Sequence, residues 1–161
     1  MEIAYLGIGT NQGDREKNLV RALALIEERV GRIIESSSVY ETEPWGFESA
    51  NLFLNMVVKV ETKLNPFNLL GTIHDIEEEL GRKRGKTRYV TRVMDIDILF
   101  YGDTVISTEE LVIPHPLVPE RKFVLVPMAE IAPAFVHPSL GKSISILLER
   151  CRDNSKVLLN K

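Results

Sequence analysis

The segment from Val93 to Tyr101 constrains the fold most strongly, because its polarity alternates in the way that a β-strand requires. Successive side chains of a strand point to opposite faces of a sheet. One face of this strand is apolar throughout, with Met94, Ile96, Ile98 and Phe100. The opposite face begins with two carboxylates, and its members are Asp95, Asp97, Leu99 and Tyr101. The apolar face must be covered by helices, whereas the carboxylates, about 7 Å apart along the strand, need cations or water beside them.

Similar patterns precede this strand. Extended segments are expected at Ile3–Gly9, which would end in a glycine-rich turn, at Arg32–Glu43 and at Phe53–Thr62. Amphipathic helices are expected at Asn18–Val30 and between Asn65 and Gly81. The second helix would have its asparagine as cap and a proline at its first position. Its buried face is expected to consist of Phe67, Leu70, Ile73, Ile76 (or Glu77) and Leu80.

The resulting order of strand, helix, strand, strand, helix, strand is typical of ferredoxin-like βαββαβ proteins. We therefore predict an α+β fold with a mostly antiparallel sheet and two helices on one face. After Thr108 the chain has proline-rich loops, and two more helices are expected near Val118–Ile131 and Ser143–Arg152. At 161 residues and 44% hydrophobic, the chain has the size of a single domain, which we expect to span residues 1–161.

Composition excludes several classes of protein. The net charge of −3 weighs against non-specific nucleic-acid binding, which usually shows as a basic face over a whole domain. The single cysteine, Cys151, excludes an intramolecular disulfide and a cysteine-based zinc site. No signal-peptide pattern is present, and no apolar stretch approaches the ~20 residues needed to span a bilayer. A cytoplasmic protein is expected.

A cluster of basic residues comes directly before the strand that carries the carboxylates. Six basic residues and no acidic one occur between positions 82 and 92: Arg82, Lys83, Arg84, Lys86, Arg88 and Arg92. Guanidinium groups suit phosphate oxygens, and carboxylates spaced i, i+2 suit Mg²⁺, which is usually shared with substrate phosphates. The combination favours chemistry on a nucleotide polyphosphate. The alternatives are that the carboxylates form salt bridges or face water, and that the basic loop is simply solvated.

Two phosphate-binding motifs are nearly matched but fail on spacing. The stretch from Gly81 to Thr87 has three residues between its glycines where a Walker A loop has four, and it follows a helix instead of a strand. The stretch from Gly7 to Gly13 also departs from the spacing of the dinucleotide fingerprint. Neither a P-loop nor a dinucleotide site is therefore expected.

Two further segments offer residues for a second substrate. Phe53 and Asn55 share one face of a strand, where a ring could stack on a flat heterocycle while an amide bonds its edge. Taken alone, Phe53 is more typical of a core residue, and Asn55 of a polar strand residue with a local partner. Trp45, the only tryptophan, lies in the loop before this strand. A later segment, 113–124, adds His115, Arg121 and Phe123.

Together these segments resemble the 6-hydroxymethyl-7,8-dihydropterin pyrophosphokinases, a family of folate biosynthesis. The matching motifs are G-I-G-T-N at 7–11, Y-x-T-x-P at 40–44, F-L-N at 53–55, G-R-x-R at 81–84, R-x-M-D-I-D-I-L at 92–99 and P-H-P…E-R-x-F-V-L-x-P at 114–127. They occur in the family's order and cover nearly the whole chain. The resemblance implies that the pyrophosphoryl group of ATP is transferred to the pterin hydroxymethyl oxygen, and that AMP is released.

The resemblance also implies a role for individual residues. Two Mg²⁺ ions would be held by Asp95 and Asp97, and charge during transfer would be stabilised by Arg82 and Arg92. The ATP site would consist of Glu77, Arg84, Arg88, Arg92, His115 and Arg121. The pterin site would consist of Thr42, Trp45, Phe53, Asn55 and Phe123. Two positions depart from the family pattern. At 88–92, R-Y-V-T-R replaces the R-W-G-P-R of many members. Glu110 stands where some members have a basic residue.

Two other functions stay open on the sequence. A conventional ATP-dependent kinase of a small heterocyclic alcohol would release ADP instead of AMP. A ferredoxin-like nucleic-acid-binding module would bind RNA without turnover, although the sequence lacks an RNP1-type motif. A monomer that acts on small molecules, without nucleic-acid or membrane partners, is expected.

Overall fold

A computed structural model of the chain describes residues 1–43, 52–81 and 93–160. Within these residues, six strands form one sheet in the order β5-β1-β4-β3-β8, with β2 also paired to β4. Every pair is antiparallel. The strands of this sheet are β1 (Glu2–Thr10), β2 (Gly31–Ser36), β3 (Tyr40–Thr42), β4 (Phe53–Thr62), β5 (Asp95–Tyr101) and β8 (Val157–Leu159). The predicted ferredoxin-like order is confirmed through β5.

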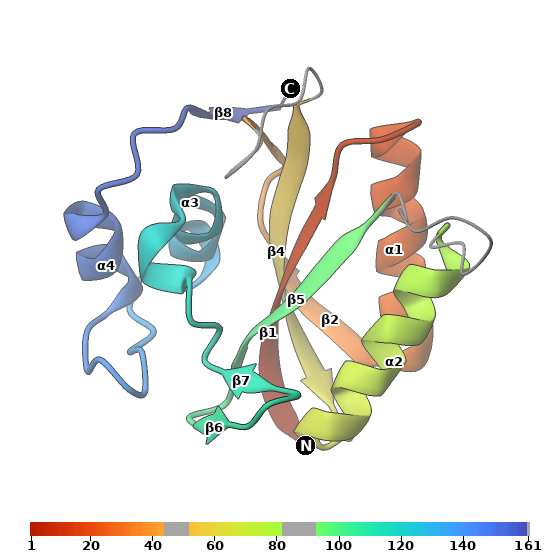
Figure 1. Cartoon of the computed structure of the whole chain (residues 1–161), viewed down its shortest axis with the longest axis horizontal. Coiled ribbons are helices and arrows are strands. Elements are labelled where there is room, and N and C mark those ends of the chain that lie inside the picture. Colours follow the sequence, from red (N-terminus) through yellow and green to blue (C-terminus); the bar gives the residue numbers. More distant parts are fainter. Residues whose placement is uncertain (44–51, 82–92, 161) are drawn as a thin grey trace.

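Helices cover both faces of the sheet (Figure 1). The helices are α1 (Arg15–Arg29), α2 (Pro66–Glu79), the short 3₁₀ helix η1 (Val118–Glu120), α3 (Lys122–Ile131) and α4 (Ile144–Arg150). The first two helices lie on one face, as predicted, and α3 and α4 lie on the other. A small hairpin of β6 (Ile106–Ser107) and β7 (Val112–Ile113) connects β5 to η1. The hairpin and β8 were not among the elements expected from the sequence.

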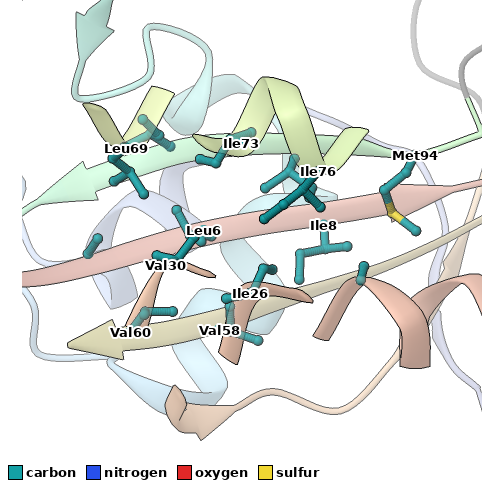
Figure 2. Close-up of a cluster of buried hydrophobic side chains, with 14 of the residues drawn as sticks. Leu6, Ile8, Ile26, Val30, Val58, Val60, Leu69, Ile73, Ile76 and Met94 are labelled. Atoms are coloured by element: carbon teal, nitrogen blue, oxygen red, sulfur yellow. The ribbon is translucent and has the colours of Figure 1, made fainter. Parts of the chain in front are cut away.

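Each face of the sheet carries its own apolar cluster. Beneath α1 and α2, Leu6 and Ile8 of β1 are buried with side chains of both helices, including Ile26 and Ile73 (Figure 2). Beneath α3 and α4, the buried side chains are Tyr5, Val57, Leu99, Phe100, Val118, Val124, Leu125, Met128, Ile144 and Leu147. Burial of each large apolar side chain contributes roughly 1.5–3 kcal/mol, so both layers stabilise the sheet.

The start of α2 is as predicted, and so is the burial of Ile73, Ile76, Glu77 and Leu80, but the first turn of its buried face differs. The side chain of Asn65 accepts a hydrogen bond from the Asn68 N–H at 2.8 Å, and proline follows as the first helical residue. The buried residues are Leu69, Ile73, Ile76 and Glu77. Phe67 is 45% exposed and Leu70 is only half-buried, which corrects the predicted face. The buried face of α2 begins at Leu69. Phe67 lies two positions earlier and therefore points about 200° away from Leu69 around the helix.

The structure also corrects two expectations about strands. Strand β1 continues through Gly7 and Gly9 to Thr10, so these glycines lie inside a strand and not in a turn. In β5, the alternation holds up to Ile98, where the pairing with β1 shifts register. Phe100 therefore joins Leu99 under α3 and α4, and Tyr101 joins the opposite cluster. Such a β-bulge turns the following side chains to the other face.

The segment 32–43, where one extended run was expected, forms two strands, β2 and β3. Strand β3 lies between β4 and β8 in the sheet. The segment 118–131 likewise divides into η1 and α3. Among the residues that the structure describes, no helix combines the length and the apolar character needed to cross a membrane.

Candidate active site

The centre of the sheet, on the side of α3, is hollowed because two positions of β1 have no side chain. Gly9 pairs with Asp95 of β5 on one side and with Asn55 of β4 on the other. Gly7 pairs in the same way with Asp97 and Val57. The two carboxylates and the asparagine therefore face one another across a floor of backbone. Glycine inside a strand commonly marks such a close approach.

This floor belongs to a cavity of about 150 Å³, here called the sheet cavity. Its lining includes Gly7, Gly9, Thr42, Glu43, Phe53, Asn55, Asp95, Asp97, Leu99, Arg121 and Phe123. Strands β3, β4 and β5 and the start of α3 each contribute to it. Seven of the residues that the sequence placed in a site thus lie around one cavity, although the sequence predicted them from three separate segments.

The walls of the sheet cavity combine rings with hydrogen-bonding groups. Thr42 pairs with Phe53 across β3 and β4, and its hydroxyl accepts a hydrogen bond from the Asn55 amide Nδ2 at 2.5 Å. That bond leaves Oδ1 of Asn55 over Gly9, where an added Cβ atom would approach it to 2.6 Å. Phe123 comes from the first turn of α3, and the Arg121 guanidinium lies 5.5 Å from the centre of its ring. This distance is within the range of a cation–π contact.

A second depression, here called the helix hollow, lies on the side of α2. Its lining includes Leu70, His74, Glu77, Asp95, Asp97, Glu110, Leu111 and His115. Asp95 and Asp97 line both the helix hollow and the sheet cavity. A ligand in either depression would therefore meet the same pair of carboxylates.

Glu77 and His115 are fixed in the helix hollow by backbone contacts. Glu77 is 8% exposed, and its Oε2 accepts a hydrogen bond from the Ile96 N–H of β5 at 3.0 Å. Nδ1 of His115 accepts a hydrogen bond from the Leu117 N–H at 3.2 Å, so in the neutral ring the proton is on Nε2. Burial lowers the pKa of His115; Asp97 opposes this shift and the positive charge of Arg121 adds to it. The imidazole is therefore neutral at pH 7 and can donate through Nε2.

The donor atoms of Asp95 and Asp97, where the two depressions meet, fit a hard cation that also binds oxygen atoms of a substrate. Among residues 1–43, 52–81 and 93–160, no three or more His, Cys, Asp or Glu side chains gather as a metal site. Asp95 and Asp97 supply two carboxylates, and Mg²⁺ is commonly bound by one or two carboxylates together with phosphate oxygens and water. The donor set fits Mg²⁺ in a nucleotide complex better than a cage made by protein alone.

Other predicted site residues fall outside the part of the chain that the structure describes: Trp45, Arg82, Arg84, Arg88 and Arg92. The structure also brings residues to the site that the sequence did not predict. Gly7 and Gly9 form the floor, and their i, i+2 spacing within an apolar strand pattern was a usable signal. His74 and Glu110 line the helix hollow without any local pattern that singles them out.

Fold and site together define a class: an antiparallel α+β protein whose paired aspartates join two ligand-sized depressions. The model of the family described as 7,8-dihydro-6-hydroxymethylpterin-pyrophosphokinase matches residues 5–133. The 2-amino-4-hydroxy-6-hydroxymethyldihydropteridine pyrophosphokinase of Bacillus subtilis (strain 168) is 48% identical over 130 residues, which are 80% of this chain and 77% of that protein. The enzyme of the same name from Aquifex aeolicus (strain VF5) is 42% identical over 89% of both chains.

Solved structures agree on the fold. Plasmodium falciparum HPPK-DHPS superimposes with a TM-score of 0.75 at 22% identity, over 93% of this chain. The chain spans 43% of the length of that longer protein. The chain belongs to the 7,8-dihydro-6-hydroxymethylpterin pyrophosphokinase family.

Proposed function

We propose that this chain transfers the pyrophosphoryl group of ATP to the hydroxymethyl group of 6-hydroxymethyl-7,8-dihydropterin in folate biosynthesis, with Mg²⁺ held by Asp95 and Asp97. Membership of the pyrophosphokinase family supports the reaction. The observation that carries the site assignment is that the two depressions share these two carboxylates. Two substrates that react with each other must meet at one place, and the shared carboxylates mark it.

The pterin is assigned to the sheet cavity. A flat bicyclic ring can lie between Phe53 and Phe123, which line this cavity from β4 and α3. Because Nδ2 of Asn55 already donates to Thr42, Oδ1 is the atom that can accept from an N–H group on the pterin edge. Backbone groups around Thr42 can bond the same edge, and the resemblance adds Trp45, which lies outside the described residues, to this site.

ATP is assigned to the helix hollow. The Nε2–H of His115 is suited to phosphate oxygens. Arg121, which the resemblance assigns to ATP, lines the sheet cavity and not this hollow. Glu77 lies at the back of this hollow, where its hydrogen bond to Ile96 holds β5 and with it the two aspartates. The resemblance adds Arg82, Arg84, Arg88 and Arg92, which lie outside the described residues and would bind the triphosphate and stabilise its charge during transfer.

In the proposed reaction, a bond forms between the pterin hydroxymethyl oxygen and the β-phosphorus of ATP. The bond from that phosphorus to the α-phosphate oxygen breaks, AMP leaves, and the hydroxyl proton passes to solvent. Mg²⁺, which Asp95 and Asp97 would hold, would supply charge neutralisation on the phosphates when bound. The contribution of the chain is mainly to position both substrates and to place positive groups around the phosphates.

The nucleotide that the reaction releases from ATP tests this proposal. Purified protein, incubated with ATP, Mg²⁺ and 6-hydroxymethyl-7,8-dihydropterin, should release AMP in a one-to-one ratio with pterin pyrophosphate. Release of ADP would identify a conventional kinase and contradict the proposal. Tight RNA binding without turnover of ATP would favour the nucleic-acid-binding alternative. One domain over residues 1–161, a monomeric state and a cytoplasmic location stay predictions, the second to be checked by light scattering.

A further inference from the structure

The segment that follows α4 contacts both walls of the sheet cavity. We call residues 151–160 the C-terminal strap. The strap leaves α4, passes α3 and ends as β8 beside β3 (Figure 1). Strand β3 carries Thr42, and the start of α3 carries Phe123, so the strap joins the two elements between which the pterin is assigned.

Asp153 attaches the strap to α3. Its Oδ2 accepts a hydrogen bond from the N–H of Lys122, the first residue of α3, at 3.0 Å. The first N–H groups of a helix have no partner inside the helix, and a negative charge is favourable at that end. Lys122 lies between Arg121 and Phe123 in the chain, and both of these neighbours line the sheet cavity. The contact therefore fixes the backbone from which both side chains project.

The end of the C-terminal strap is attached to β3, the strand that carries Thr42. Oδ1 of Asp153 accepts from the Ser155 N–H at 2.9 Å and from the Ser155 hydroxyl at 2.5 Å. Strand β8 then pairs with β3, with Val157 opposite Thr42. The Asn160 N–H donates to the Val39 carbonyl at 2.9 Å and extends this pairing. Oδ2 of Asp153 thus contacts the start of α3, while Oδ1 closes a local turn at Ser155, two residues before β8 begins.

We propose that Asp153 is a positioning residue for the pterin site, which it serves by holding the α3 wall at a fixed separation from the β3 and β4 wall. A flat ring stacked on both faces needs walls roughly 7 Å apart, twice the ~3.5 Å contact distance of carbon atoms. Asp153 lies beyond residues 5–133, the part of the chain that the family model matches. The inference rests on the proposed assignment of the pterin to the sheet cavity.

The test compares Asp153→Ala with Ser143→Ala. Ser143 caps α4 by accepting from the Ile146 N–H at 3.3 Å, so its loss also removes one helix cap, but not one that holds the cavity. Dissociation constants are measured by calorimetry for the pterin substrate, with Mg²⁺ and a non-hydrolysable ATP analogue at saturation, and for the analogue alone. Asp153→Ala should weaken pterin binding about tenfold and change nucleotide binding less than twofold. Ser143→Ala should leave both constants near those of the wild-type chain.

Asp153→Asn provides a graded variant. A carboxamide has one acceptor oxygen, so it cannot accept from the Lys122 N–H and from the Ser155 N–H through separate oxygens as the carboxylate does. Its pterin affinity should lie between those of the wild-type chain and Asp153→Ala. Equal affinity in all three proteins would overturn the proposal. So would an equal loss of pterin and nucleotide affinity in Asp153→Ala and Ser143→Ala, because that result indicates general loosening.

Hydrogen exchange separates this inference from the proposed function. In Asp153→Ala, the backbone amides of residues 122–125 and 40–42 should exchange faster than in the wild-type chain, while those of α2 stay unchanged. Unchanged exchange in both segments would show that Asp153 does not hold the walls, whatever the substrate. If the wild-type chain binds no pterin while exchange responds as expected, the assignment of the pterin is wrong, and Asp153 is not a positioning residue for it.

Discussion

At the residue scale, Gly9 shapes the site because it has no side chain. An added Cβ atom would lie 2.6 Å from Oδ1 of Asn55 and 3.8 Å from a ring carbon of Phe53. The first distance is too short for any side chain, so Asn55 would have to move. The residue assigned to reading the pterin edge and the residue beneath it are therefore coupled.

Gly9→Ala should raise the KM for pterin by about tenfold, since displacing Asn55 costs one buried hydrogen bond of roughly 1–3 kcal/mol. The KM for ATP should change little. Gly71→Ala is a suitable control, because an added Cβ atom there meets nothing within 4 Å and Gly71 lies inside α2. That change should stabilise the helix by about 0.5–1 kcal/mol. Steady-state kinetics and urea unfolding of both variants check the expectation, and an unchanged pterin KM in Gly9→Ala would contradict it.

Asp97 lies in both depressions, so its carboxylate is expected to matter for turnover and not for folding. Asp97→Asn keeps the shape of the side chain but removes its charge. The rate of Mg²⁺-dependent AMP release should fall by on the order of 10³-fold, comparable to the loss of a preorganised charge-stabilising group. Asp103→Asn, in the exposed turn after β5, should keep full activity. Near-normal AMP release by Asp97→Asn would refute the metal assignment.

At the element scale, α3 is also attached to β3 near its C-terminal end. Glu130 accepts hydrogen bonds from the Ser38 N–H at 3.0 Å, from the Ser38 hydroxyl at 2.8 Å and from the Tyr40 hydroxyl at 2.6 Å. Partial burial, together with Glu130, raises the pKa of Tyr40 to about 12. Although burial opposes ionisation, the bonds from Tyr40 and Ser38 hold the pKa of Glu130 below its usual range. The wall that carries Phe123 is thus attached to β3 at two places.

The contact between Tyr40 and Glu130 should make the free energy of unfolding depend on pH in both the acid and the alkaline range. Glu130 has a lowered folded pKa, so its contribution is present above its ordinary pKa of about 4.5 and lost as the pH falls through the folded value. Tyr40 has a raised folded pKa, so its contribution is present below pH 10.0 and lost as the pH rises towards about 12. Tyr40→Phe should cost about 1 kcal/mol at neutral pH and remove the alkaline loss.

Urea unfolding between pH 3 and 12 measures this dependence. Glu130→Gln should reduce the loss of stability at acid pH. Glu149→Gln, which changes an exposed carboxylate on α4, serves as its control. The interpretation fails if the Tyr40→Phe protein and the wild-type chain lose stability in parallel above pH 10.

Elements also show where local patterns stop being informative. The cap and proline of α2 were predictable because they act within one turn of helix. The face of α2 that is buried was not, since Phe67 and Leu69 are both apolar and only contact with the sheet selects between them. The register shift in β5 is equally invisible in the sequence, because Leu99, Phe100 and Tyr101 are all compatible with either face.

At the scale of the whole molecule, the sheet holds both depressions in one frame. Ligands that bind only the folded protein stabilise it, by about 2.7 kcal/mol at a hundredfold excess over Kd. A non-hydrolysable ATP analogue with Mg²⁺ should therefore raise the Tm by roughly 5–10 °C for a chain of this size. Removal of Mg²⁺ with a chelator should abolish most of the rise, and Asp97→Asn should show none that depends on Mg²⁺. A shift of equal size with and without Mg²⁺ would argue against a metal at this junction.

The sequence alone predicts the order of strands and helices through β5, the cap of α2 and the two carboxylates on one face of β5, because these depend on spacings of two to four residues. The family motifs added a prediction of which residues form the site. Tertiary packing was needed to show that Asp95 and Asp97 line two depressions, that Gly7 and Gly9 form the floor of the sheet cavity, and that Asp153 contacts the start of α3. Those contacts join residues distant in the chain, and their geometry depends on how the sheet and both helix layers pack, which no local pattern specifies.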